Sequence, residues 1–276
     1  MSNKNRARIP FVARPFEGLA AEEDFVAFMQ IVPAGRITVR LIQEYGGTEV
    51  DLVTLLPDLA QAFRRADGRI LVALQTVTKS GDSSRDVAAA LLSALELEPG
   101  SGLAMTGLPE PGPRLQDILD STFTPVVEVK ETFDFWLTDA EAASDEAAHA
   151  LAEAKEDIAP TLPVPGVEHA YWCQLNGKEF VRWVRGENED AFFNAFARLH
   201  GAGSSDLNGQ RFLGAFRACG LAIPVWELEP GTTAQDLTAP MQEMATRLDE
   251  ALAVTGPLDA AARRAKAGII SRQVNL

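Results

Sequence analysis

The sequence predicts a mixed α/β protein built from two related halves, each a β-β-α-α-β-α unit whose sheet is mixed or antiparallel. Three observations carry this prediction. Segments with strand-like alternation are interspersed with amphipathic, helix-like segments along the chain. A segment with three prolines, residues 158–166 (IAPTLPVPG), interrupts this order. After it, three segments of the first half recur in the same order.

The first half opens with two predicted strands separated by the turn Gly46-Gly47. Because the first position of a helix tolerates proline, Pro57 and the following LAQAFRR predict a short helix that ends at Gly68. Ser83 or Ser84 is the predicted N-cap of the next helix. The elements expected in this half are strands at 37–41, 49–56, 70–77 and 125–133 and helices at 59–65, 87–97, 114–120 and 139–156.

The second half begins with a hairpin, because Asn176-Gly177 lies between the strand-like AYWCQL and EFVRWV. Both turn residues tolerate positive φ, as the tightest hairpin turns require. The elements expected after this hairpin are a helix at 188–200, a short helix at 209–218, a strand at 224–228 and a helix at 235–253.

A tandem duplication is predicted from three pairs of similar segments. They are 86–95 with 190–199, 112–119 with 209–216, and 125–129 with 224–228. The expected organisation is an N-terminal arm at 1–36, a first repeat at 37–157, a Pro-rich linker at 158–166, a second repeat at 167–256 and a basic C-terminal tail at 257–276. The alternative is that two unrelated α/β segments share these patterns by chance.

The charge of the chain limits the classes of partner that it is expected to bind. Residues 1–8 and 257–276 each carry a net charge of +3, so the stretch between them carries −20 against −14 for the whole chain. Such an acidic body repels phosphate backbones, which makes nucleic-acid binding by the body unlikely. Basic termini that touch RNA or an acidic partner are the weakest alternative, because short basic ends are usually solvated tails.

Composition and the N-terminus favour a cytoplasmic protein. Hydrophobic residues make up 46% of the chain and charged residues 23%, as in ordinary globular proteins. Two cysteines, Cys173 and Cys219, are too few for a disulfide framework and suit a reducing compartment. The N-terminus has no apolar signal-peptide core, and no stretch is long and apolar enough to span a bilayer. The oligomeric state stays open.

The sequence contains none of the common catalytic motifs that would identify a reaction. The chain has no GxGxxG after a strand, no complete Walker loop, no HExxH and no GxSxG, so neither a cofactor nor a metal is expected. His149, His169 and His200 are each expected at the surface or at a helix end. The carboxylates offer many pairs, of which Asp82 and Asp86 bracket a helix start.

A possible binding surface lies on the predicted hairpin of the second half. It would combine the aromatic Trp172 and Trp183 with the polar Asn176, Lys178 and Arg182. Aromatic and cationic side chains together are enriched in binding sites. The alternative, which we favour, is that the aromatic residues pack the core of the second half.

Several segments carry a family resemblance. They are FVARPFEGL (11–19), SGDSSRD (80–86), GPRLQDILD (112–120), AYWCQLNGK (170–178) and PVWEL (224–228). Through them the chain resembles an uncharacterised bacterial family, a domain of unknown function, some of whose members are labelled SEC-C-motif or translocase-related proteins. The resemblance implies no activity. Some relatives carry an N-terminal zinc knuckle, whereas the arm of this chain contains no cysteine.

Two functions from different classes remain. The first is a non-catalytic cytoplasmic module that binds a protein partner, as the duplication and the missing catalytic motifs indicate. The alternative is an enzyme whose site lies at the interface between the repeats. It would use carboxylates such as Asp82, Asp86 or Glu128 with Arg114 or Arg211.

Overall fold

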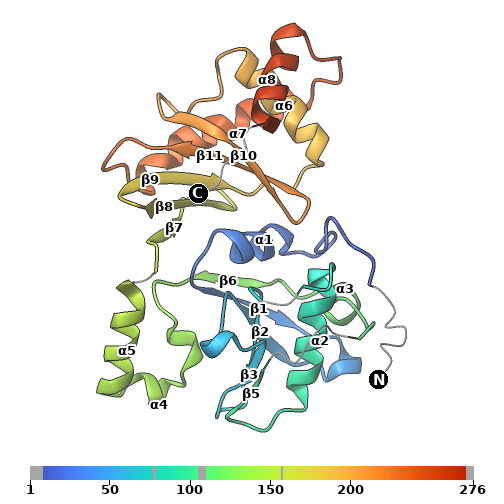
Figure 1. The fold of residues 1–276 in the computed structure, drawn as a ribbon, viewed down its shortest axis with the longest axis vertical. Coiled ribbons are helices and arrows are strands. Elements are labelled where there is room, and N and C mark those ends of the chain that lie inside the picture. Colours follow the sequence, from blue (N-terminus) through green and yellow to red (C-terminus); the bar gives the residue numbers. More distant parts are fainter. Residues whose placement is uncertain (1–8, 77–78, 105–109, 157, 272–276) are drawn as a thin grey trace, which may run out of the picture. The chain divides into compact units, whose positions relative to one another are not determined.

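The computed structural model describes residues 9–76, 79–104, 110–156 and 158–271. The chain divides into two compact units, Met1–Ile158 and Ala159–Leu276, and each contains one sheet together with helices (Figure 1). The predicted mixed α/β class is confirmed. Outside the described residues lie 1–8 of the predicted arm, 272–276 of the predicted basic tail (257–276), residue 77 of the predicted strand at 70–77 and residue 157 of the predicted first repeat.

The N-terminal unit is built on a six-stranded mixed sheet with the order β5-β3-β4-β2-β1-β6. Only β2 and β4 are paired in parallel within the described sheet, and the other neighbours are antiparallel. The strands are β1 (Gly35–Arg40), β2 (Glu49–Val53), β3 (Ala62–Arg64), β4 (Ile70–Ala73), β5 (Ser101–Leu103) and β6 (Val126–Val129). All four residues of β4 are buried, as its uninterrupted apolar sequence predicts.

Helices and short turns cover this sheet. The helical elements are α1 (Glu22–Gln30), η1 (Gln43–Tyr45), η2 (Pro57–Leu59), α2 (Ser83–Leu95), α3 (Leu115–Ile118), η3 (Asp134–Trp136), α4 (Asp139–Ala142) and α5 (Asp145–Glu156). The α2 helix packs against β3, β4 and β5. Leu71 and Ala73, alternate residues of β4, instead join an apolar cluster with Phe133 and Phe135. Both faces of β4 are therefore covered.

The C-terminal unit contains a five-stranded antiparallel sheet with the order β10-β11-β9-β8-β7. Its elements are β7 (Thr161–Pro163), β8 (Ala170–Leu175), β9 (Lys178–Trp183), α6 (Glu189–Gly201), β10 (Arg211–Ala218), β11 (Leu221–Glu227), η4 (Gln235–Leu237), α7 (Thr238–Leu252) and α8 (Ala260–Ser271). The predicted hairpin joins β8 and β9, with Asn176 at φ 51° and Gly177 at φ 74°. Strand β7 lies within the Pro-rich segment, and α8 packs against α6.

Two predicted helices are wrong. Of residues 59–65, only Leu59 is helical, as the last residue of the 3-10 turn η2; Asp58 and Leu59 have positive φ, and the chain then enters β3. Residues 211–218 of the predicted helix at 209–218 form β10, which pairs with β11 through a tight turn at Cys219 and Gly220. Both residues of that turn have positive φ, the geometry of a two-residue hairpin loop.

The tandem duplication is not confirmed. The segment 112–119 contributes α3, whereas its counterpart 209–216 contributes to β10. The segments of the third pair, 125–129 and 224–228, both contribute strands. However, β6 lies at the edge of its sheet beside β1, whereas β11 lies between β10 and β9. Similar local patterns therefore occupy different positions in two different strand orders.

An aromatic cluster fills the core of the C-terminal unit and generates a first prediction. The Phe196 ring is fully buried, 4.6 Å from the ring centre of Phe212 and 5.9 Å from that of Trp226. Replacing it with alanine removes these contacts and leaves a cavity. We expect Phe196→Ala to lower the free energy of unfolding by about 3–5 kcal/mol in urea denaturation. Val254→Ala, at a side chain that is 49% exposed, should change it by less than about 0.5 kcal/mol. Equal effects of the two variants would contradict this account of the core.

Candidate functional site

A pocket of about 820 Å³ opens on the N-terminal unit. Its lining residues come from η2, β3, the segment around β5, and the segment that runs from η3 into α4. The residues that line it lie between Pro57 and Glu141, so the pocket belongs to this unit alone. We refer to it as the Trp136 pocket.

The floor of the Trp136 pocket is open because β5 supplies almost no side-chain volume. Gly100, Gly102 and Ala104 alternate along the chain and all line the pocket. In a strand, alternate residues share one face. Gly102 is paired with Phe63 of β3, whose ring also lines the pocket. A Cβ at Gly102 would meet only ordinary contacts, the nearest being Cδ2 of Phe63 at 3.7 Å.

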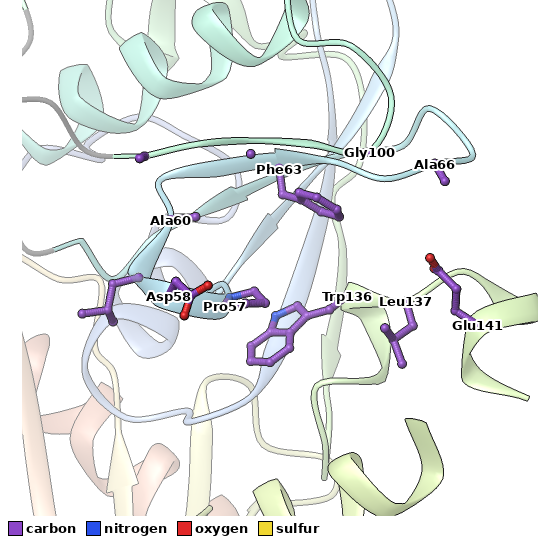
Figure 2. A pocket seen from close by; sticks show the side chains of 12 residues that line it. Pro57, Asp58, Ala60, Phe63, Ala66, Gly100, Trp136, Leu137 and Glu141 are labelled. Carbon is purple, nitrogen blue, oxygen red and sulfur yellow. The ribbon is translucent and has the colours of Figure 1, made fainter. Parts of the chain in front are cut away.

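Trp136 forms the opposite wall and is held firmly. Its ring is stacked on Phe133, with the ring centres 4.3 Å apart and the planes at 5°. Its indole N–H donates a hydrogen bond of 2.9 Å to the carbonyl of Leu55. Phe63 and Trp136 point into the same space from opposite sides (Figure 2). The pocket therefore contains an aromatic wall that needs little ordering before it contacts a ligand.

The rim at η2 is strained. Asp58 has φ 54° and Leu59 has φ 55°, the left-handed region that is rare for residues other than glycine, asparagine and aspartate. The side chain of Leu59 is 58% exposed, although it is large and apolar. Strained backbone and exposed apolar side chains both concentrate at ligand-binding sites.

Both charged residues among the described lining residues are acidic, Asp58 and Glu141. The Thr138 backbone N–H and hydroxyl both donate to Glu141, at 2.8 and 2.7 Å. These two hydrogen bonds hold the pKa of the Glu141 carboxyl below its ordinary value. Glu141 is therefore ionised at neutral pH, and the rim of the pocket is negative.

The hairpin residues predicted as a binding surface lie in different environments. Trp183 is buried in the core, and its N–H donates to the carbonyl of Glu168. Trp172 packs against the same core, with its N–H on the carbonyl of Thr232. Strand alternation places Arg182 on the other face of β9, where it is buried beside Cys173.

Asn176 and Lys178 lie at the exposed end of the hairpin, where Lys178 forms an ion pair of 2.6 Å with Glu227. The five residues therefore lie in three separate places: the two tryptophans at the core, Asn176 and Lys178 at the exposed hairpin end, and Arg182 on the opposite face of β9. A binding role for these five residues stays a prediction.

The carboxylates proposed for catalysis are held by structural contacts. Asp82 is 1% exposed, caps α2 and accepts a hydrogen bond of 2.9 Å from Arg114. Arg114 also donates to the carbonyl of Pro15, as does Gln116. Ser84 donates to Gln116 and accepts from the backbone of Leu115. Three of the segments that carried the family resemblance, 11–19, 80–86 and 112–120, thus meet at Asp82.

The remaining candidates are also engaged. Asp86 is buried and accepts the backbone N–H of Ser80, and burial raises the pKa of its carboxyl. Glu128 pairs with Arg36, and Glu227 pairs with Arg211.

The three histidines lie on or beside other elements, with His149 in α5, His200 in α6 and His169 directly before β8. His200 shares a hydrogen bond of 2.7 Å with Ser205, His149 is exposed beside Glu153, and His169 has φ 57°. Among the described residues, no group of three or more His, Cys, Asp or Glu is placed to hold a metal ion. Likewise, no helix in the described ranges is long and apolar enough to cross a membrane.

Arg114 and Arg211, paired by the predicted repeat, provide a matched test of these ion pairs. Arg114→Ala removes the hydrogen-bonded ion pair of the buried Asp82 carboxylate and leaves it only the longer contact with Arg85, at 3.7 Å. We expect the free energy of unfolding to fall by about 1–3 kcal/mol in urea denaturation. Arg211 is 71% exposed, so Arg211→Ala should cost less than about 1 kcal/mol. A larger loss at Arg211 than at Arg114 would show that the Asp82 contact is not structural.

Comparisons with known proteins place the chain in a family but assign no activity. Searches of curated proteins and of solved structures each found no significant match. A model of one family, described as a family of unknown function (DUF5926), matches residues 15–276. The bacterial origin and the SEC-C label implied by the resemblance stay predictions. The match extends over nearly the whole chain, which therefore belongs to the family of unknown function DUF5926.

Proposed function

We propose that the chain is a non-catalytic cytoplasmic binding module, and that its N-terminal unit holds an apolar segment of a protein partner in the Trp136 pocket. One observation carries the proposal. The open floor at Gly102 faces a fixed aromatic wall at Trp136, so apolar volume is left free beside a surface already arranged to contact it. The volume of the Trp136 pocket lies within the range of roughly 300–1,000 Å³ that is typical of ligand pockets.

The chemistry of the lining favours binding over catalysis. General acid–base catalysis needs a group whose pKa lies near the operating pH. The pKa of Glu141 is lowered, so this carboxylate is a poor proton donor at neutral pH. Asp82 and Arg114, two of the residues named for the enzymatic alternative, bind each other, and Arg114 also donates to the carbonyl of Pro15. These contacts leave the apolar pocket as the better-supported site.

The cytoplasmic location is inferred from the cysteines. Cys173 is buried and Cys219 is partly exposed, and no disulfide joins them. Free thiols persist in a reducing compartment.

The Trp136 pocket can be tested by filling it from within the fold. Gly102→Val places a β-branched side chain, which strands accommodate well, on the pocket floor. With the neutral apolar dye N-phenyl-1-naphthylamine as probe, we expect wild-type protein to enhance its fluorescence on binding. The variant should bind about tenfold or more weakly, because added methyl groups remove ligand contacts.

Gly256→Val is the matched control, since a Cβ at Gly256 meets nothing within 4 Å and this residue does not line the pocket. Its affinity for the dye should equal that of the wild type. Equal binding by the Gly102 variant, or no binding by the wild type, would remove the support for this pocket as a binding site.

A further inference from the structure

We propose that the segment bound by the Trp136 pocket is basic as well as apolar: a peptide whose apolar side chains enter the pocket and whose adjacent Lys or Arg residues are bound by Asp58 and Glu141. The inference rests on the proposed function and adds the chemical class of the partner.

The rim supplies charge of one sign only. Asp58 and Glu141 are the charged residues among the described ones that line the pocket, and both side chains reach solvent. In Figure 2, Asp58 lies beside Pro57 at one side of the pocket and Glu141 beside Leu137 at the other. A ligand that fills the apolar space therefore has a carboxylate near each end.

The nearby cation does not neutralise this rim. Arg65 donates to the carbonyls of Phe135 and Leu137, at 3.1 and 2.7 Å, directly before α4. It also forms an ion pair of 2.5 Å with Asp67. Asp67, a carboxylate outside the pocket lining, therefore shares the charge of Arg65, although the Arg65 cation still helps to lower the pKa of Glu141.

The helices that follow Glu141 extend the negative surface. Over residues 139–156, six exposed carboxylates stand against a single lysine. They are Asp139, Glu141, Asp145, Glu146, Glu153 and Glu156, and the lysine is Lys155. Lys155 is itself paired with Glu131 at 2.5 Å. A partner that approaches the pocket along α4 and α5 therefore meets an acidic surface, which attracts basic segments and repels acidic ones.

Exposed carboxylates of this kind contribute mainly to selection between partners. Each exposed ion pair is weak, so the apolar contacts supply most of the affinity and the rim discriminates by charge. An apolar segment with phosphate or carboxylate groups beside it would place like charges against Asp58 and Glu141. The structure thus favours one class of peptide over the others.

The test uses the full chain and three synthetic peptides that displace N-phenyl-1-naphthylamine. The peptides share an apolar core of leucines and phenylalanine and differ in their flanks, which are lysines, glutamines or glutamates. We expect the lysine-flanked peptide to bind most tightly and the glutamate-flanked peptide most weakly. Each charge contact should change affinity about two- to fivefold at low salt. In about 1 M salt, where the Debye length is only about 3 Å, the differences should shrink.

Conservative variants assign the preference to the rim. In the double variant Asp58→Asn and Glu141→Gln, asparagine tolerates the positive φ at 58 and glutamine retains the hydrogen bonds of the helix cap. The double variant should lose most of the preference for lysine-flanked over glutamine-flanked peptides while still binding the dye. The control is Glu243→Gln with Asp249→Asn, which removes the same charge from exposed positions of α7.

The outcomes separate this inference from the proposed function. If the three peptides bind equally, or the glutamate-flanked peptide binds best, the charge preference is overturned while dye binding still supports the pocket. If the control variant loses the preference as much as the rim variant, net charge rather than the rim is responsible, and the assignment to Asp58 and Glu141 is wrong. If no peptide displaces the dye, a peptide segment is not the occupant.

Discussion

The hydrogen bond from the Trp136 N–H to the carbonyl of Leu55 is the contact on which the candidate site depends. It joins the segment after β6 to the segment after β2, two parts of the chain that are far apart in sequence. Stacking on Phe133 fixes the remaining freedom of the indole ring. A buried indole N–H needs such a partner, so the bond fixes the position of the wall as well as stabilising it. The packing of Phe133 and Phe135 and the hydrogen bonds from Arg65 also hold η3 against the sheet, and the indole bond adds the fixed orientation of the Trp136 ring.

The apolar layer that contains Phe133 explains why the Trp136 pocket forms beside β3 and β5. Over β2 and β4, Val53, Leu71 and Ala73 pack with Phe133 and Phe135. At β5 the lining residue is Gly102, flanked by Gly100 and Ala104, so these positions add little side-chain volume to the layer beside Phe63. A well-packed interior leaves few voids, and a large one lined by apolar side chains is therefore a local feature of this sequence.

Much of the local structure was predictable, because it follows from residues that act on their own neighbours. Asn176-Gly177 predicted the β8–β9 hairpin, and the apolar run at 70–77 predicted buried β4. The N-cap of α2 is Asp82, one residue before the predicted serines. The strand β10 was missed because its aromatic residues fit either a helix or a strand. The signal that favours a strand is the turn at Cys219 and Gly220.

The Trp136 pocket was not predicted, for a different physical reason. Its walls come from residues between 57 and 141, which are brought together by the pairing of β3 with β5 and by the hydrogen bond from Trp136 to Leu55. The one local signal is the alternation of small residues at 100, 102 and 104, which predicts a strand face without side chains. The hairpin of the C-terminal unit shows the opposite case. Its aromatic residues were conspicuous in the sequence, yet Trp183 packs in the hydrophobic core.

Leu59 shows that the rim is costly to maintain. Glycine would occupy φ 55° without strain, whereas a leucine there is held against its preference by the surrounding fold. Leucine at this position gains little from burial, because its side chain is 58% exposed. The folded chain alone therefore does not account for the residue. A bound apolar segment does, since it would cover Leu59 and recover the hydrophobic free energy that the free protein lacks.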